Sequence, residues 1–118
     1  YINFCLMLSN NGSFNKMNIL SSESIEMMTK NQIGDTVYPW DEGVKFGYGF
    51  SVVTNDDLSR LSDSNGSFGW SGAAGTHFTI DPEKNIILIL ITQRMHPWSS
   101  VWKTFNDMTY NSIRNNLK

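Results

Sequence analysis

Residues 66–81 read GSFGWSGAAGTHFTID, and this stretch decides the fold. Residues 67–71 and 76–80 each have the composition of a short strand, with aromatic and β-branched side chains. Residues 72–75 between them carry almost no side chain, so the backbone edge there can come close to a ligand. We therefore predict two antiparallel strands whose connection forms the wall of an active site.

One further strand is predicted on each side of this pair. Residues 81–85, DPEKN, are typical of a tight turn, because Pro82 suits its second position and Asn85 tolerates a positive φ. The apolar run after the turn predicts a last strand over 86–92. Upstream, residues 46–53 predict a strand in spite of two glycines, because three aromatic residues at alternate positions share one face. Polar loops are expected over the stretches before and after that strand.

Helices are predicted at both ends of the chain. Residues 1–9 have the pattern of the last turns of a helix, and residues 22–31 that of a second helix with Ser21 as its N-cap. The C-terminal helix has an apolar stripe, formed by positions 98, 101, 102, 105, 108, 113 and 117. The predicted fold class is α+β: an antiparallel sheet of about four strands, with two N-terminal helices and a C-terminal helix packed on it. We expect the C-terminal helix to cover one sheet face, while the sequence supplies little cover for the other.

The composition excludes several classes of function. The chain has 118 residues and a formal net charge of −2, which argues against nucleic-acid binding by phosphate neutralisation. It has no apolar stretch long enough to span a membrane. The single Cys5 lies in an apolar helical pattern and is expected to be a packed thiol. His77 and His96 are far apart and lack carboxylate-rich surroundings, so neither a metal nor another cofactor is expected.

The order of short motifs resembles that of a known family. The motifs are FCLML at 4–8, NILS at 18–21, MMT at 27–29, FGYGF at 46–50, WSGAAGT at 70–76, IDP at 80–82 and TQ at 92–93. In this order they resemble the C-terminal part of the serine beta-lactamase-like hydrolases, a family that includes class C beta-lactamases, DD-peptidases and related esterases. The resemblance covers nearly the whole chain.

The resemblance implies an acyl-enzyme mechanism. In that family the active serine stands in a Ser-x-x-Lys motif, a Tyr-x-Asn motif follows, and a Lys-Thr-Gly or Trp-x-Gly motif lies on a strand at a sheet edge. Trp70-Ser71-Gly72 looks like the third motif. The first two normally lie well upstream, so we expect residues 1–118 to be an incomplete C-terminal segment of the α/β lobe, without the nucleophile. We assign the short matches that begin at Ser13 and Ser100 (Ser-x-x-Lys) and at Tyr1 (Tyr-x-Asn) to chance.

The same resemblance gives roles to the residues around the third motif. A backbone N–H on the strand just after the motif, that of Ala73, would be the second donor of the oxyanion hole. Ser71 would offer its hydroxyl to the substrate, and Trp70, Ser71 and Gly72 would line the substrate site. Trp70 replaces a lysine of beta-lactamases and DD-peptidases, which favours esters or less charged amides over penicillins. His77 and Arg94 are possible further contacts. Each of these residues also has a purely structural interpretation, as strand packing or a solvated surface group.

Two functions remain open from the sequence, and a third, weaker interpretation is a complete small α+β interaction domain that shares only local patterns with the family. The first is a segment of a serine hydrolase that acts on an ester or amide, with a small-molecule or peptide-like acyl substrate and the N-terminal part of its own domain as partners. The second is a non-catalytic binding or sensor module of the same fold. For the first, we expect the 118 residues alone to be inactive. We also expect self-association, which would hide an uncovered sheet face and edge. The chain opens with Tyr1 and no leader pattern, so we expect its native start to be missing, and no compartment is assigned.

Overall fold

The computed structural model describes residues 1–36, 38–39, 41–60, 62–95 and 101–116. Its elements, in chain order, are α1 (Ile2–Ser9), β1 (Ser13–Phe14), β2 (Met17–Asn18), α2 (Ser22–Met28), β3 (Val44–Phe46), β4 (Ser51–Val53), β5 (Phe68–Ser71), β6 (His77–Asp81), β7 (Ile86–Leu90) and α3 (Val101–Asn116). Strands β3 to β7 form one antiparallel sheet in sequence order, and β1 and β2 form a separate small hairpin. The predicted α+β class is confirmed.

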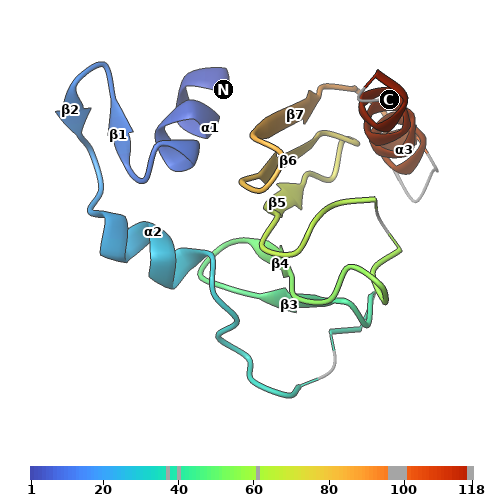
Figure 1. The fold of residues 1–118 in the computed structure, drawn as a ribbon, viewed down its shortest axis with the longest axis horizontal. Coiled ribbons are helices and arrows are strands. Elements are labelled where there is room, and N and C mark those ends of the chain that lie inside the picture. Colours follow the sequence, from blue (N-terminus) through green and yellow to red (C-terminus); the bar gives the residue numbers. More distant parts are fainter. Residues whose placement is uncertain (37, 40, 61, 96–100, 117–118) are drawn as a thin grey trace.

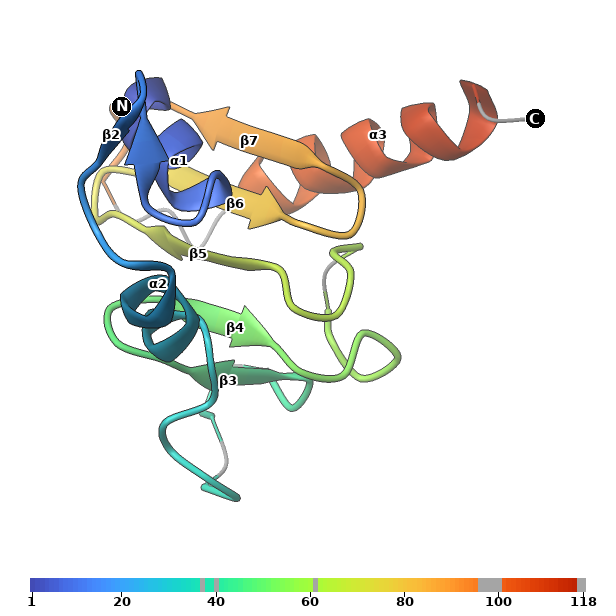
Figure 2. The same cartoon turned by 60° about the vertical axis from the view of Figure 1, so that its left-hand side comes forward.

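The sheet lies between helices on both faces. Figures 1 and 2 show α1 on one side of β6 and β7 and α3 on the other side, with α2 beside the β3–β4 end. The expectation that one face has little cover is therefore wrong, because α1 and α2 bury apolar side chains against it. These buried residues are Cys5, Met7, Leu8, Ile25, Phe50, Val52, Phe68, Phe78 and Ile80. Cys5 is a free, fully buried thiol, as predicted.

The predicted strand over 46–53 is in fact a hairpin. Strands β3 and β4 pair through Phe46↔Ser51, and the Gly47 amide donates to the Phe50 carbonyl at 2.8 Å to close the turn. Gly49 takes a φ of +91°, which a glycine adopts at little cost. Gly47 packs on the end of α2, where an added Cβ would lie 2.0 Å from the Met28 carbonyl oxygen. The sheet thus has five strands among the described residues rather than about four.

Helix α2 begins as predicted and ends earlier. The Ser21 hydroxyl accepts from the Ser24 amide at 3.1 Å, as expected of an N-cap. The helix stops at Met28 rather than near 31, because the chain then turns back onto the sheet. There the Gln32 amide donates to the Phe46 carbonyl at 2.8 Å, and the Met28 carbonyl accepts from the Tyr48 amide at 3.1 Å.

Helix α3 docks through buried polar side chains and through only part of the predicted stripe, in which Trp102, Phe105 and Ile113 are half-buried. Val101 and Met108 of that stripe are exposed, whereas Asn106 and Tyr110 are buried. Positions 98 and 117 of the stripe lie outside the described residues. The Tyr110 hydroxyl donates to Asp81 Oδ2 at 2.7 Å, and Asn106 Nδ2 donates to Asp63 Oδ1 at 2.5 Å. Both carboxylates belong to the sheet end and its neighbouring loop, so these bonds attach α3 to the sheet.

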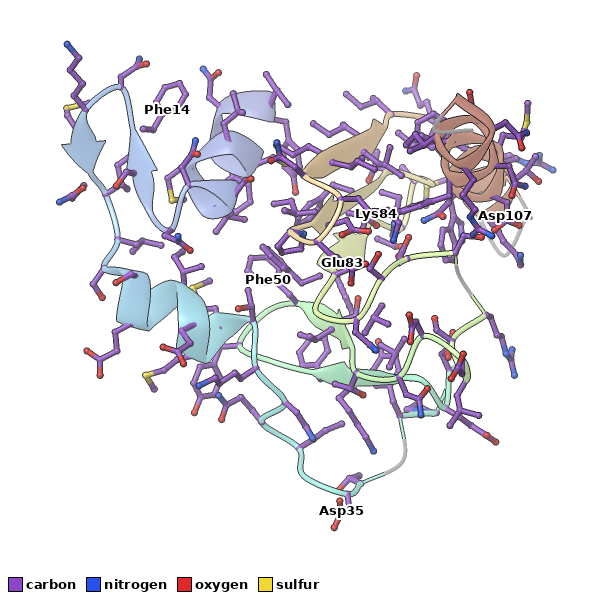
Figure 3. The ribbon with its side chains drawn as sticks, in the orientation of Figure 1. Phe14, Asp35, Phe50, Glu83, Lys84 and Asp107 are labelled. Atoms are coloured by element: carbon purple, nitrogen blue, oxygen red, sulfur yellow. The ribbon has the colours of Figure 1, made fainter. Side chains whose placement is uncertain are left out.

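The side chains in Figure 3 show the difference between the side of the sheet that faces α1 and α2 and the side that faces α3. Phe50 points to the side of α1 and α2, while Lys84 and Asp107 lie on the side of α3. Lys84 Nζ lies 5.6 Å from the centre of the Tyr110 ring and also contacts Ser64 Oγ. One sheet face therefore packs on apolar groups, and the other is joined to α3 by buried hydrogen bonds.

Candidate functional site at the end of β5

Strand β5 has one edge that is only partly paired. Strand β6 pairs with all of it, from Phe68↔Ile80 to Ser71↔His77. Strand β4 pairs only with Phe68 and Gly69. The Gly72 amide donates to the Thr76 carbonyl at 2.8 Å, so by alternation Ser71↔His77 is a pair without hydrogen bonds between its backbones. The backbone groups of Ser71 therefore point away from β6, toward the open edge.

The residues after β5 form a tight turn rather than a strand, which corrects the predicted position of Ala73. Gly75 has a φ of +76°, and its amide donates to the Gly72 carbonyl at 3.0 Å. The Ala74 carbonyl accepts from the Arg94 amide at 3.0 Å and from the Thr92 hydroxyl at 2.9 Å. These bonds anchor the turn to the chain just after β7. Ala73 is exposed, and no described residue accepts a hydrogen bond from its amide.

Trp70 lies at the surface among aromatic rings. Its side chain is 42% exposed, so Trp70 is not a core residue. Its ring meets that of Phe46 edge to face at 5.1 Å, and Phe46 stacks on Tyr38 at 6.2 Å. Phe46 pairs with Ser51, which in turn pairs with Gly69, so the contact between the two rings reaches across the start of β4. The indole thus offers a partly exposed apolar surface beside the open edge of β5.

Ser71 and His77 are brought together by the strand pairing. Ser71 Oγ lies 2.7 Å from His77 Nδ1, and His77 Nε2 lies 2.8 Å from Thr79 Oγ1. The imidazole stacks on Trp102 of α3, with centroids 4.6 Å apart and planes at 27°. Burial lowers the pKa of His77 to about 4, so the ring is neutral at pH 7. The result is a continuous hydrogen-bonded row from buried Thr79 to exposed Ser71.

Two members of this group are not indicated as functional by the sequence. Thr79 could have been found, because residues two apart on a strand share a face and His77 was already a candidate. Trp102 carries no such signal, since its contact with His77 depends on how α3 docks. Arg94 contributes its backbone amide to the Ala74 carbonyl, while its side chain is exposed. His96 and the Ser-x-x-Lys match at Ser100 lie outside the described residues.

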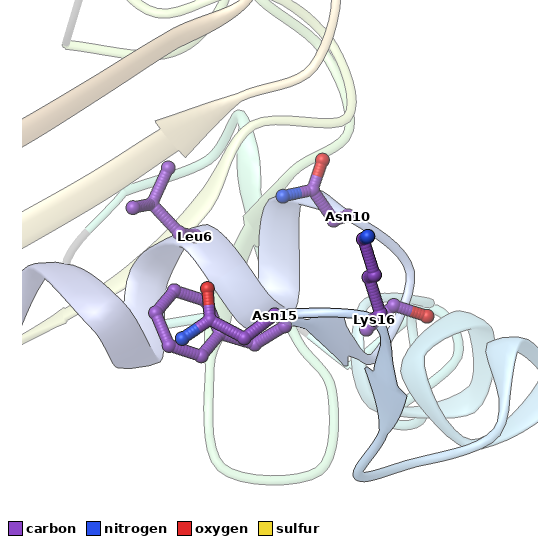
Figure 4. A pocket seen from close by; sticks show the side chains of 6 residues that line it. Leu6, Asn10, Asn15 and Lys16 are labelled. Carbon is purple, nitrogen blue, oxygen red and sulfur yellow. The ribbon is translucent and has the colours of Figure 1, made fainter.

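Other features of the chain lie away from this end of β5. A shallow hollow of about 330 Å³ is lined by Leu6, Asn10, Ser13, Phe14, Asn15 and Lys16, at the corner between α1 and β1 (Figure 4). Ser13, at which one of the chance Ser-x-x-Lys matches begins, belongs to the β1–β2 hairpin. In the described part of the chain, no group of three or more His, Cys, Asp or Glu residues is placed to hold a metal ion. The described helices include none with the length and apolar character needed to cross a membrane.

The chain is similar to curated proteins and to solved structures. Two curated proteins of Mycobacterium tuberculosis, Protein Rv1367c (strain H37Rv) and Uncharacterized protein MT1414 (strain CDC 1551), are each 32% identical to this chain over 103 residues. Each match takes in 79% of this chain and 26% of the relative, so the chain spans about a quarter of the relatives' length. Among solved structures, EstCE1, described as a hydrolase with promiscuous acyltransferase activity, has the same fold. Its TM-score is 0.76 at 23% identity, over 88% of this chain and 27% of EstCE1.

The family of the chain is given directly by a match to a family model. The model of the family described as Beta-lactamase matches residues 5–104, which include α1 from Cys5 onward, the whole five-stranded sheet and the start of α3. This range contains each of the ordered motifs except the first residue of FCLML. The resemblance drawn from those motifs is thereby confirmed, and the chain belongs to the Beta-lactamase family.

Proposed function

We propose that this chain supplies the third-motif strand and the oxyanion-hole edge of a serine hydrolase that forms an acyl-enzyme with an ester or amide. The observation that carries the proposal is the open end of β5. There, the exposed Ala73 amide has no acceptor among the described residues, and the exposed Ser71 lies on the part of the edge that β4 leaves unpaired. An acyl-transfer site needs such donors, aimed at the oxygen on which negative charge develops.

Each residue of the site has a distinct part in this reaction. The Ala73 amide would donate to the oxyanion, together with the amide of the nucleophile itself. The Ser71 hydroxyl would bind an oxygen of the substrate, and Gly72 would let the substrate lie close to the backbone. Trp70 would give an apolar wall where a lysine would bring a positive charge. This difference favours esters and weakly charged amides over substrates that need a cation beside them.

The nucleophile, its lysine and the tyrosine are proposed to lie in a longer protein of which residues 1–118 are the C-terminal part. The chain spans only about a quarter of its curated relatives, which is consistent with this division. Acyl transfer is also the chemistry named for EstCE1, whose fold this chain shares. Without a serine activated by a neighbouring base, the 118 residues are expected to bind but not to turn over substrate. Because α1 and α2 cover the sheet face, self-association of the separate chain would have to hide the open edge of β5 alone, and it stays a prediction that light scattering checks.

The test compares the longer protein with the 118-residue chain. Both are assayed with a nitrophenyl ester and with a chromogenic cephalosporin, and both are treated with a fluorophosphonate that labels activated serines. We expect the longer protein to hydrolyse the ester faster than the cephalosporin and to be labelled at a Ser-x-x-Lys serine, while the chain alone does neither. Turnover by the chain alone would contradict the division of roles. Ligand binding without turnover by the longer protein would favour the non-catalytic sensor.

A further inference from the structure

The hydrogen bonds that link Thr79, His77 and Ser71 can be assigned donors and acceptors. The assignment follows from where each proton can go. Thr79 Oγ1 is buried, with the residue only 3% exposed, and its partner in the described structure is His77 Nε2. A threonine hydroxyl has one proton to donate, and a buried donor left unpaired costs about 1–3 kcal/mol. If Nε2 carried the ring proton, Thr79 would accept it, and its own proton would have no acceptor. The satisfied arrangement is therefore a Thr79 hydroxyl that donates to an unprotonated Nε2.

The remaining steps follow from the chemistry of a neutral imidazole. A neutral ring with an unprotonated Nε2 carries its proton on Nδ1, which then donates to Ser71 Oγ over 2.7 Å. Burial keeps the ring neutral, and Trp102 holds it by stacking. Because Ser71 Oγ already accepts from His77, its own proton is directed elsewhere. Ser71 is exposed at the end of β5, so this proton is available to an acceptor outside the described residues.

We propose that His77 is a positioning residue that holds the Ser71 hydroxyl as an outward hydrogen-bond donor, so that this edge selects ligands with an oxygen acceptor, a carbonyl or a carboxylate, opposite Ser71. The proposal rests on the proposed function for the identity of the ligand, but the direction of the row does not. A donor in a row of hydrogen bonds is also strengthened by the bonds behind it. Thr79 and His77 thus act on the ligand through Ser71 and do not touch it.

The first test reads the ring proton without any assay of activity. In the ¹⁵N-labelled longer protein, the shifts of the two ring nitrogens of His77 tell which one is protonated, and the signals missing from His77→Asn identify that ring. We expect Nδ1 to carry the proton in the unchanged protein and in Thr79→Ser, which keeps the hydroxyl. Thr79→Val has the same shape without the hydroxyl, so it should lose this preference. A proton on Nε2 in the unchanged protein would overturn the proposal, whether or not the protein is an enzyme.

The second test is a double-mutant cycle on the hydrolysis of the nitrophenyl ester and the carboxylate-bearing cephalosporin. Ser71→Ala and His77→Phe should each raise KM about three- to tenfold, the worth of one hydrogen bond, with a smaller change in kcat. The double variant should be no worse than either single one, because both remove the same bond. His77→Asn should have a KM close to that of the unchanged protein, unlike His77→Phe, since its amide nitrogen stands where Nδ1 stood. Thermal unfolding of each variant verifies that it is folded.

The outcomes separate this inference from the proposed function. Losses that add in the double variant, or no rescue by His77→Asn, would overturn the role of His77 in an active enzyme. A protein without turnover would contradict the proposed function alone, because the ring-nitrogen measurement still decides the direction of the row.

Discussion

The hydroxyl of Tyr110 donates a 2.7 Å hydrogen bond to Oδ2 of Asp81, and both side chains are fully or almost fully buried. Asp81 also accepts from the amides of Ser64 at 3.3 Å and Lys84 at 2.9 Å. Burial disfavours the charged carboxylate, but the hydrogen bonds from Lys84, Tyr110 and Ser64 outweigh it and hold the pKa of Asp81 below its usual value. Helix α3 is thus attached to the sheet through a carboxylate that stays ionised.

Tyr110→Phe tests this attachment. The variant keeps the ring and removes one hydrogen bond to a buried charge, so we expect the free energy of unfolding to fall by about 1.5–3 kcal/mol. Urea denaturation monitored by circular dichroism measures it. Met108→Ala on the same helix is the control, because Met108 is 67% exposed and should change stability by less than about 0.5 kcal/mol. Equal effects of the two variants would show that the bond to Asp81 does not hold α3.

Asp63→Asn is expected to stabilise the protein at neutral pH. Burial raises the pKa of Asp63 from 3.8 to about 6, although the bond from Asn106 opposes this. The folded state therefore binds an extra proton between about pH 4 and pH 6, and stability falls as the pH rises through this window. The penalty at pH 7 is about 3 kcal/mol at most. The substitution would remove this penalty, and the new amide would bring an N–H donor to the contact with Asn106, whose Oδ1 has no partner among the described residues.

The measurement is a series of urea titrations of both proteins between pH 4.5 and pH 7.5. The increase in the free energy of unfolding caused by Asp63→Asn should grow as the pH rises and level off above about pH 6 to 7. A gain that does not depend on pH would mean that Asp63 is not protonated in the folded protein in this range.

His77 should give a pH dependence of the opposite sign. Burial lowers its pKa from 6.5 to about 4, so the unfolded chain binds a proton that the folded chain does not. Stability is then complete above about pH 6.5 and is lost as the pH falls toward 4, by up to about 3 kcal/mol. His77→Gln should flatten this slope. In the unchanged protein the pH dependences of stability due to Asp63 and to His77 overlap and partly cancel. The pH dependence due to His77 is therefore best measured in the Asp63→Asn variant.

Ala73→Pro tests the proposed oxyanion donor. Proline has no N–H, so the longer protein should lose about 10²–10³-fold in kcat on the nitrophenyl ester, the usual effect of removing one such donor. Ala73→Ser keeps the N–H at the same exposed position and serves as the matched control. Similar activity of the two variants would exclude this amide from the reaction, and a circular dichroism spectrum shows whether the turn at 72–75 has disturbed the sheet.

Gly69→Ala tests the close pairing of β5 and β6. An added Cβ would lie 2.0 Å from the Phe78 carbonyl oxygen, a rigid backbone atom, so the strands would have to separate. We expect a loss of about 3 kcal/mol or more, at the upper end of overpacking effects. Gly66→Ala is the comparison, because nothing lies within 4 Å of its Cβ and only its φ of +82° is unfavourable, which costs about 1 kcal/mol. The difference between the two unfolding free energies is the quantity to measure.

Local signals in the sequence were reliable where a single turn of chain decides the structure. Ser21 caps α2 and Asn85 takes a φ of +54°, both as predicted, because each depends on the backbone within a few residues. The pairing of 67–71 with 76–80 was also predicted, since a short connection between two strands leaves few other arrangements. The prediction of a single strand over residues 46–53 was wrong. Alternating aromatic residues are typical of one strand, but Gly47 and Gly49 turn the chain there.

The strand that carries the candidate residues was predicted from the sequence, but the contacts of those residues were not. Trp70, Ser71, Gly72 and Ala73 stand at the end of β5 as the motif implies, whereas Ala73 lies in a turn. The order of motifs by itself determined the family and the α+β class, because patterns of apolar and small residues are written along the chain. Only the tertiary structure decided that Ser71, His77, Thr79 and Trp102 form one group and that α3 docks on Asp63 and Asp81, because these contacts join residues that are distant in sequence and depend on how the helix packs.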